Sequence, residues 1–273
     1  MTRSIKRIAI ISIYLLILIA FLVFIYLKFQ TKPSCFDGIQ NQNEQGADCG
    51  GICAEQCALT AEKDLMVQKT GFVPSGVANN YDIYAVVSNP NQTLGSSKFN
   101  YQFTIKDAAG TIIATKNDTG FILSGETKYL VSSNQTMSDI PASVELSLSN
   151  PQWIEVNDLY EKPQLKIVYK NYKEITNGVG FSEATGLLKN ESPLDFSLIK
   201  LEIILKDNQG QVIGLNSTQM GTVQAGENRD FRFFWPNKFP GTVANMEVQP
   251  EVNIFNSDAF VKKYFKPAKF QQH

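Results

Sequence analysis

The sequence predicts an all-β protein in which two tandem β-sandwiches follow an N-terminal apolar helix and a small cysteine-rich segment. Three observations support this fold class. Apolar residues make up 43% of the 273 residues, enough to build a packed core. After residue 64, short segments of alternating and β-branched residues are separated by turn residues such as NPNQ, KDAAG and KDNQG. These segments also recur along the chain, which indicates two copies of one unit.

Composition and charge exclude several classes of function. The chain has 25 Lys and Arg against 26 Asp and Glu, so a nucleic-acid partner is not expected. Its one histidine is His273, the last residue, which disfavours His-dependent catalysis and His-built metal sites. There is no Gly-rich phosphate loop, no G-x-S-x-G and no H-E-x-x-H. We therefore expect a protein that is not an enzyme.

The first element is an uninterrupted apolar run, Ile8–Leu27. As a helix it would be roughly 30 Å long, the thickness of a bilayer's hydrocarbon core. Arg3, Lys6 and Arg7 precede it, which favours an N-terminus on the cytoplasmic side. The sequence thus predicts a single-pass cell-membrane protein, with a cytoplasmic stub at residues 1–7, a transmembrane helix at 8–28 that holds the membrane, and extracytoplasmic C-terminal domains.

Three alternatives for this segment fit less well. A cleaved signal peptide would have a shorter apolar region that ends in small residues. A lipoprotein anchor on Cys35 would need that cysteine closer to the apolar run. A buried core helix would carry a polar face, and this segment is apolar on all sides.

The second element, a neck at residues 29–60, contains every cysteine of the chain: Cys35, Cys49, Cys53 and Cys57. An even, clustered set in an oxidising compartment indicates two disulfides, and three pairings are open. The segment has few large apolar residues, so cross-links must hold it together. A zinc site fits less well, because the spacing is not that of paired C-x-x-C ligands.

Oxygen-bearing side chains also gather in this neck. A calcium site would use Asp37, Asn41, Asn43, Glu44 and Asp48, which lie within a dozen residues of one another. Their spacing does not match an EF-hand loop. The alternative is that these side chains cap turns in a small disulfide-linked segment.

The neck carries the pattern D-G-x-x-N-x-x-E-x-G-x-D-C-G-G-x-C, which starts at Asp37 and ends at Cys53. It resembles a short cysteine-rich module of secreted and surface-attached microbial proteins. The resemblance covers about residues 35–57. It implies an exterior location and says little about activity.

The rest of the chain aligns with itself, residues 64–160 against 163–262, before a tail at 263–273. Lys106, Asp107 and Gly110 recur 100 places later as Lys206, Asp207 and Gly210, and Gly-Glu pairs recur at Gly125 and Gly226. A repeat of this length is too long for a solenoid unit and has the size of an immunoglobulin-like sandwich. The predicted architecture is therefore two tandem immunoglobulin-like β-sandwiches.

Each copy contains an Asp-x-x-Gly turn between two predicted strands. Asp107 and Asp207 can accept hydrogen bonds from the backbone of the turn, and Gly110 and Gly210 can adopt the left-handed conformation that closes a hairpin.

The residues around these turns resemble a known family. Phe103-Thr-Ile-Lys-Asp107 is similar to the F-x-L-Y-D pattern of a group of extracytoplasmic β-sandwich domains, and Ile203-x-Leu205-Lys206-Asp207 keeps part of it. The resemblance spans about residues 81–131 and 181–234. It implies a sandwich exposed at a cell surface or in an envelope, and it supplies no catalytic residues.

An aromatic run near the end of the second copy is the candidate partner site. Strand alternation would place Phe231, Phe233 and Trp235 in the core, with Phe234 pointing outward near Phe239. The two outward rings would bind a partner. The alternative is that they pack in the core or against the other copy.

These observations favour a membrane-anchored, extracytoplasmic and non-catalytic protein that acts in surface display, adhesion or scaffolding. Its partner would be an unknown protein or a cell-wall or surface polysaccharide. One alternative is an accessory subunit of a membrane-bound envelope complex. Another is a calcium-dependent carbohydrate binder or an envelope enzyme.

Overall fold

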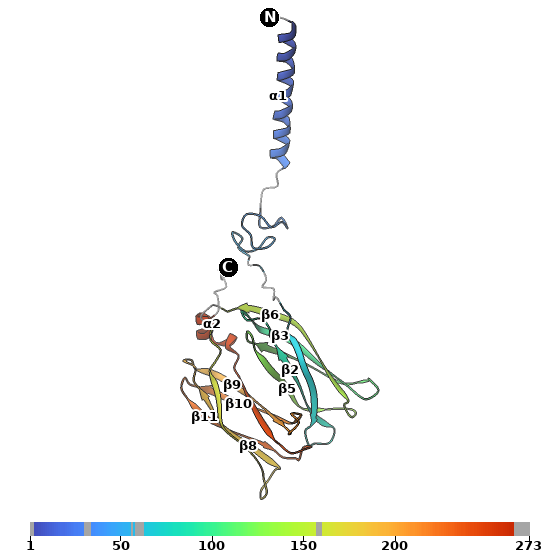
Figure 1. Ribbon diagram of the computed structural model, residues 1–273, viewed down its shortest axis with the longest axis vertical. Helices are drawn as coiled ribbons and strands as arrows, with labels where there is room; N and C mark the ends of the chain where they lie inside the picture. The colour runs from blue at the N-terminus through green and yellow to red at the C-terminus, as the bar shows by residue number, and fades with distance from the viewer. Residues whose placement is uncertain (1–2, 30–33, 56, 58–62, 157–159, 265–273) are drawn as a thin grey trace. The chain divides into compact units, whose positions relative to one another are not determined.

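The computed structural model describes residues 3–29, 34–55, 57, 63–156 and 160–264 (Figure 1). One long helix, α1 (Arg3–Phe29), precedes the strands, and a short 3-10 turn, η1 (Ile254–Asn256), and a helix, α2 (Asp258–Tyr264), follow them. The strands are β1 (Met66–Pro74), β2 (Asn80–Ser88), β3 (Leu94–Lys106), β4 (Ile112–Ile122), β5 (Thr127–Thr136), β6 (Ser143–Glu155), β7 (Leu165–Glu174), β8 (Ser182–Asn190), β9 (Phe196–Lys206), β10 (Val212–Val223), β11 (Asn228–Trp235) and β12 (Asn245–Glu251). The protein is therefore all-β, as predicted.

In the described part of the chain, the strands form three-stranded antiparallel sheets that come in two equivalent pairs. The first copy supplies sheets in the order β1-β2-β5 and β4-β3-β6. The second copy supplies β7-β8-β11 and β10-β9-β12, so every strand has a counterpart six places later. Both copies lie in one compact unit, residues 59–268, and α1 and the neck belong to another.

Each copy buries the inward residues of its two sheets. The strands of the first copy enclose a core that includes Ile83, Phe99, Phe103 and Ile105, all at most 1% exposed. The second copy encloses Leu188, Leu201, Ile203, Leu205 and Phe231. These positions alternate along their strands, as expected when one sheet face packs against another.

The repeat extends to individual hydrogen bonds. The buried amide of Asn89 donates to the carbonyls of Leu94 and Leu123, and its counterpart Asn190 donates to those of Leu194 and Gln224. Asp107 accepts the N–H groups of Ala109 and Thr111 through Oδ1, and Asp207 accepts those of Gln209 and Gln211. The same side chains therefore close the same turns in both copies.

Helix α2 is not anticipated by the sequence. Phe260 and Tyr264 lie one turn apart on it, are at most 3% exposed, and place their rings against Tyr160 at centroid distances of 6.4 and 6.1 Å. These tertiary contacts stabilise a helix too short to form alone. Most of the predicted tail, residues 265–273, lies outside the described residues.

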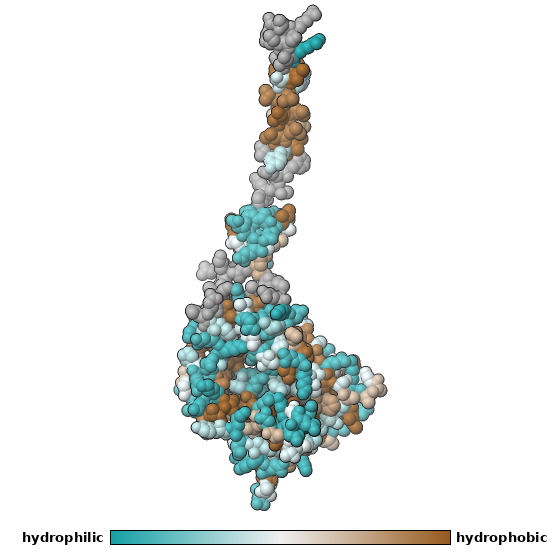
Figure 2. All heavy atoms as spheres, in the orientation of Figure 1, coloured by the Kyte–Doolittle hydropathy of each residue, from teal (hydrophilic) through white to brown (hydrophobic). Residues whose placement is uncertain are grey.

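The N-terminal element is helical, as predicted, but its interpretation changes. The described residues include no helix with the length and hydropathy that a membrane crossing requires. The part of α1 whose side chains are described, Ile10–Tyr26, is about 25 Å long at 1.5 Å per residue. Its large apolar side chains are exposed (Figure 2). The lack of such a helix among the described residues contradicts two predictions: the transmembrane helix at residues 8–28, and the single-pass location with extracytoplasmic C-terminal domains.

Within the unit formed by residues 59–268, the two copies pack through specific sheet faces. Val73 and Tyr84 of the first copy form one apolar cluster with Ile204, Val212 and Leu215 of the second. On β9, Ile204 is flanked by Ile203 and Leu205, which point into the core of the second copy. Strand β9 is therefore buried on both faces, which explains its nearly continuous apolar sequence.

Polar groups complete this contact between the copies. Strand β5 pairs with β2 on one side only, and on its other side Gln249 of β12 accepts the backbone N–H of Tyr129 at 2.9 Å. Beside it, the ammonium of Lys128 lies 2.9 Å from Glu251, and these side chains are only 2% and 8% exposed. The ammonium also lies 3.9 Å from the ring centroid of Phe121. Together these contacts satisfy one backbone donor on the unpaired edge of β5 and pair a buried charge.

The conformation of the turn glycine Gly110 predicts how its replacement changes the stability of the protein. Gly110 has φ of +83°, and a Cβ there would meet no atom within 4 Å, so the cost of replacing it is conformational. We expect Gly110→Val to lower the free energy of unfolding by about 1–3 kcal/mol. Chemical denaturation followed by circular dichroism measures this change.

The control is Gly221→Ala, which also meets no atom within 4 Å but does not have a left-handed backbone. It should change stability by less than about 0.5 kcal/mol. Equal stabilities of the two variants would contradict the assigned turn.

Candidate functional site

The sheet β7-β8-β11 has one face in the core and one face that the described part of the chain leaves uncovered. Register places Leu187 beside Asp230, Thr185 beside Arg232, and Glu183 beside Phe234. On the other side of β8, Lys173 lies beside Glu183. We call this set the outer face; it consists of Tyr169, Lys173, Glu183, Thr185, Leu187, Asp230, Arg232 and Phe234.

A charge network lies on the outer face around Glu183. Its Oε1 lies 2.8 Å from Lys173 Nζ, and its Oε2 accepts from Arg232 Nε at 2.7 Å and also from Nη2. The Glu183 side chain is 7% exposed, whereas those of Lys173 and Arg232 are 61% and 59% exposed. Hydrogen bonds from Lys173 and Arg232 hold the pKa of Glu183 below its usual value. The carboxylate therefore stays charged and fixes two cations whose remaining donors face solvent.

Phe234 also lies on this face, as the alternation of β11 predicts. Its ring is 46% exposed, and the guanidinium carbon of Arg232 lies 4.5 Å from the ring centroid. Phe239, the other predicted partner-binding residue, is 5% exposed and packs its ring against those of Phe181 and Trp235. Phe239 therefore belongs to the core, which contradicts the prediction of an outward ring there; of the two predicted residues, only Phe234 offers an accessible ring.

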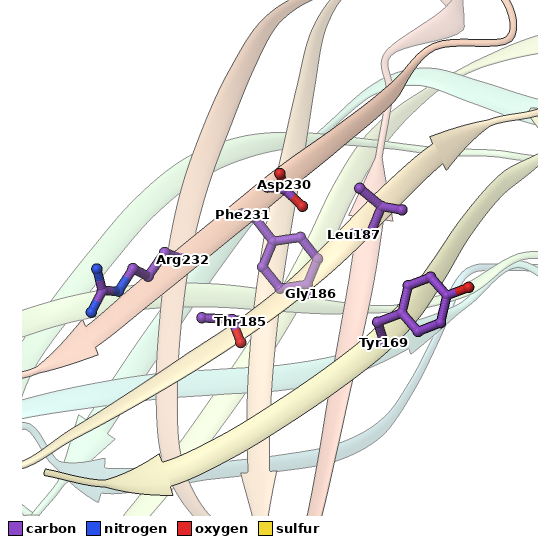
Figure 3. A pocket seen from close by; sticks show the side chains of 7 residues that line it. All are labelled: Tyr169, Thr185, Gly186, Leu187, Asp230, Phe231 and Arg232. Carbon is purple, nitrogen blue, oxygen red and sulfur yellow. The ribbon is translucent and has the colours of Figure 1, made fainter.

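Tyr169 also lies on the outer face, and no pattern in the sequence indicates its exposure. The pairing of β7 with β8 shifts between Val168 and Asn171, so Tyr169 and Lys170 both lie opposite one β8 residue. In this bulge Tyr169 has φ of +53° and an 80% exposed side chain. It borders an open hollow of about 400 Å³ with residues of all three strands (Figure 3).

The equivalent face of the first copy is covered. Register equates Tyr84 and Val131 of β2 and β5 with Thr185 and Arg232 of β8 and β11. Tyr84 is 4% exposed and packs on Ile204 of the second copy, and Val131 packs against the same cluster. One face of this type is thus buried by docking between the copies, and its counterpart is left uncovered by the described part of the chain.

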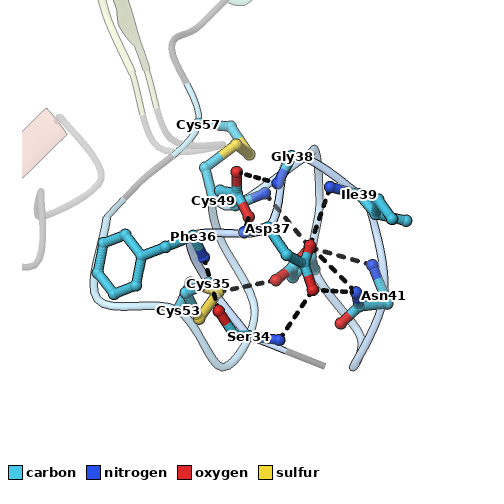
Figure 4. Close-up of a disulfide and its surroundings, with 12 residues drawn as sticks. Ser34, Cys35, Phe36, Asp37, Gly38, Ile39, Asn41, Cys49, Cys53 and Cys57 are labelled. Carbon is cyan, nitrogen blue, oxygen red and sulfur yellow. Dashed lines mark hydrogen bonds between the residues drawn. A yellow bond between two sulfur atoms is a disulfide. The ribbon is translucent and has the colours of Figure 1, made fainter. Parts of the chain in front are cut away.

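The neck forms a separate candidate site (Figure 4). Cys35 bonds to Cys53 and Cys49 bonds to Cys57, which confirms two disulfides and selects one of the three open pairings. Asp48 accepts the N–H groups of Asp37 and Gly38 at 2.8 and 2.7 Å. The acidic residues of the motif therefore satisfy backbone donors that a segment without regular secondary structure leaves unpaired.

The proposed calcium ligands are only partly brought together. Asp37 binds the amide of Asn41 and accepts the N–H groups of Ser34 and Ile39, and these backbone bonds lower the pKa of its carboxyl. Glu44 accepts the N–H groups of Asn41 and Asp48 through Oε2. Asn43 is exposed, and its side chain forms no hydrogen bond within this network among the described residues. The arrangement supports the turn-capping alternative.

One other grouping in the neck has metal-like spacing. The carboxylate of Glu44 lies near the sulfur atoms of Cys35 and Cys53, the one such cluster among the described residues. The two sulfur atoms are bonded to each other and are not thiolates. This cluster therefore does not form a thiolate metal site.

Comparisons with known proteins do not identify the chain. No family model matches it. No curated protein matches it either. Among solved structures, a red sea bream transglutaminase has 10% identity over 70% of this chain, with a TM-score of 0.22. An anti-sigma factor domain-containing protein has 12% identity over 67% of this chain and 88% of its own, with a TM-score of 0.17. A Bacteroides uniformis β-glucuronidase has 10% identity over 65% of this chain, with a TM-score of 0.17.

The chain spans 31% of the transglutaminase and 22% of the β-glucuronidase. At these TM-scores the likenesses carry no argument about function.

The close packing of Gly51 in the D-C-G-G motif predicts how its replacement changes the stability of the neck. Gly51 has φ of +58°, and a Cβ there would lie 1.9 Å from the carbonyl oxygen of Asn43. Gly51→Ala should therefore disrupt the neck, so that dithiothreitol reduces its disulfides at least tenfold faster than in the wild type. Alkylation of released thiols and mass spectrometry measure the rate.

The melting temperature of the β-sheet unit should stay unchanged in this variant, because the neck belongs to the other unit. The control is Gly38→Ala, where a Cβ meets nothing within 4 Å although φ is also positive. Equal reduction rates in both variants would show that the close approach to Asn43 is unimportant.

Proposed function

We propose that this protein is a non-catalytic scaffold or adhesion protein, which binds a partner protein through the outer face of β7-β8-β11. The observation that carries the proposal is the contrast between equivalent faces. The first copy's face is apolar and buried against the second copy, whereas the second copy's face is uncovered and presents Tyr169, Arg232 and Phe234. Aromatic residues and arginine dominate the binding energy of protein interfaces.

The chemistry of the outer face suits binding better than catalysis. Glu183 is held ionised by two cations, so it is poorly suited to exchange protons with a substrate. Hydrogen bonds to Glu183 and contact with the ring of Phe234 hold the Arg232 side chain in one conformation. Little side-chain entropy therefore remains to be lost when a partner docks. Mixed charges around exposed rings favour a protein partner, because they can define one orientation.

The proposal includes the finer fold assignment. The duplicated pairs of antiparallel sheets support tandem immunoglobulin-like sandwiches, and the Asp107 and Asp207 turns support the resemblance to the F-x-L-Y-D family. Domains of this kind position binding surfaces on a rigid framework.

Photo-crosslinking of the full chain in its native cells tests this function. A benzoylphenylalanine at position 169 should yield an adduct with a protein, and the same probe at Asn117, on the exposed face of β4, should not. Phe234→Ala should reduce the adduct at position 169 about tenfold, the effect of losing one interface ring. Phe36→Ala, which removes a 90% exposed ring in the neck, is the matched control and should leave the adduct unchanged.

Equal adducts from positions 169 and 117 would contradict the proposed surface. An adduct whose added mass is removed by glycosidases, and which leaves a sugar-bearing peptide after proteolysis, would instead favour a polysaccharide partner.

A further inference from the structure

A carboxylate is buried in the contact between the two copies. Glu202 of β9 is 1% exposed, and its Oε1 pairs with the ammonium of Lys200. Its Oε2 has no hydrogen-bond partner among the described residues. A buried carboxylate with an unpaired oxygen is costly when charged, and the cost falls when a proton binds.

Register shows that Glu202 belongs to the docking face. It lies two residues from Ile204, which packs on Tyr84 of the first copy, so both side chains leave β9 on the same side. On β12 the residue opposite Glu202 is Gln249, whose amide oxygen accepts the N–H of Tyr129 in the first copy. Separation of the copies would therefore expose Glu202 to water.

Charged and titratable groups approach Glu202 from both copies. Lys200 is on its own strand, Glu251 on β12 and Lys128 on β5, and the charges of Glu251 and Lys128 act on Glu202 in opposite directions. The hydroxyl of Tyr101 on β3 is within its electrostatic reach, and Asp118 on β4 interacts with both Tyr101 and Lys200. These neighbours carry two positive and three negative charges when Glu202 is included and Tyr101 is neutral, so a proton on Glu202 balances the cluster.

We propose that the two copies form a pH-sensitive joint, in which Glu202 takes up a proton when they dock and releases it when they separate. The joint is tighter in mildly acidic solution and looser in alkaline solution. The outer face lies on the second copy. The state of the joint would therefore determine the orientation of the outer face relative to the first copy.

The sign of the effect follows from linkage. Burial raises the pKa of Glu202 to about 7, and in the separated state the carboxyl returns toward its ordinary value of 4.5. The docked state binds more protons between these values, so its stabilisation is fully present below pH 4.5 and is lost as the pH rises to about 7. Between pH 5 and pH 8 the docking equilibrium should weaken roughly 50- to 100-fold.

Hydrogen exchange of the full chain, followed residue by residue by nuclear magnetic resonance and corrected for intrinsic rates, tests the joint. The N–H of Tyr129 is bonded to Gln249 across the contact, so its protection reports docking directly. Amides of the β3–β6 pairing, inside the first copy, report unfolding of that copy. We expect Tyr129 protection to fall roughly 50- to 100-fold from pH 5 to pH 8, while protection in β3 stays constant.

Glu202→Gln mimics the protonated acid and should keep Tyr129 protection high and constant over this range. Glu145→Gln, which changes an exposed carboxylate paired with Lys106, should behave as the wild type. Constant Tyr129 protection in the wild type, or an unchanged pH dependence in Glu202→Gln, would overturn the proposal.

Discussion

The contact of Val73 and Tyr84 with Ile204, Val212 and Leu215 determines which surfaces this protein can use. It joins two sheet faces of different type, one from each copy, and so it cannot be symmetric. An asymmetric contact between equivalent units leaves one face of each type free. Among the described residues, the two faces left free are the outer face of β7-β8-β11 and the corresponding side of β4-β3-β6. The surfaces that the β-sheet unit offers to a partner therefore follow from this asymmetry.

At several central positions the free faces are more polar than their buried counterparts. Register equates Ile204 and Leu215 of the docking face with Thr104 and Thr115 of the first copy. It also equates the buried Tyr84 with Thr185. At these positions both free faces are therefore polar where the docked faces are apolar, whereas Ile112, the counterpart of Val212, is apolar and 57% exposed. Such substitutions oppose head-to-tail association of further chains, which an asymmetric contact would otherwise permit.

Local sequence patterns predict much of this structure. The features that they do not predict depend on contacts between residues far apart in the sequence. Alternation identified the strands and the outward Phe234, and Asp107 and Gly110 identified a turn whose bonds are all local. Helix α2 depends on Tyr160, about 100 residues away, and Phe239 is buried by the rings of Phe181 and Trp235. The bulge that exposes Tyr169 is an irregularity of pairing with no signal in the spacing. The disulfide pairing likewise depends on how the neck folds.

The polar groups in the joint explain why two sandwiches dock in one orientation. Apolar area alone would tolerate a shift of one face across the other, because hydrophobic contact is not directional. Such a shift would leave Lys128 and Glu251 buried without each other and would separate Gln249 from the edge of β5, each at a cost of several kcal/mol. Glu202 makes docking depend on protonation as well, because burial of its unpaired oxygen costs least when the carboxyl is protonated. Hydrogen bonds and charges thus specify the register in which the two copies dock. The apolar area that the cluster removes from water determines how strongly they dock.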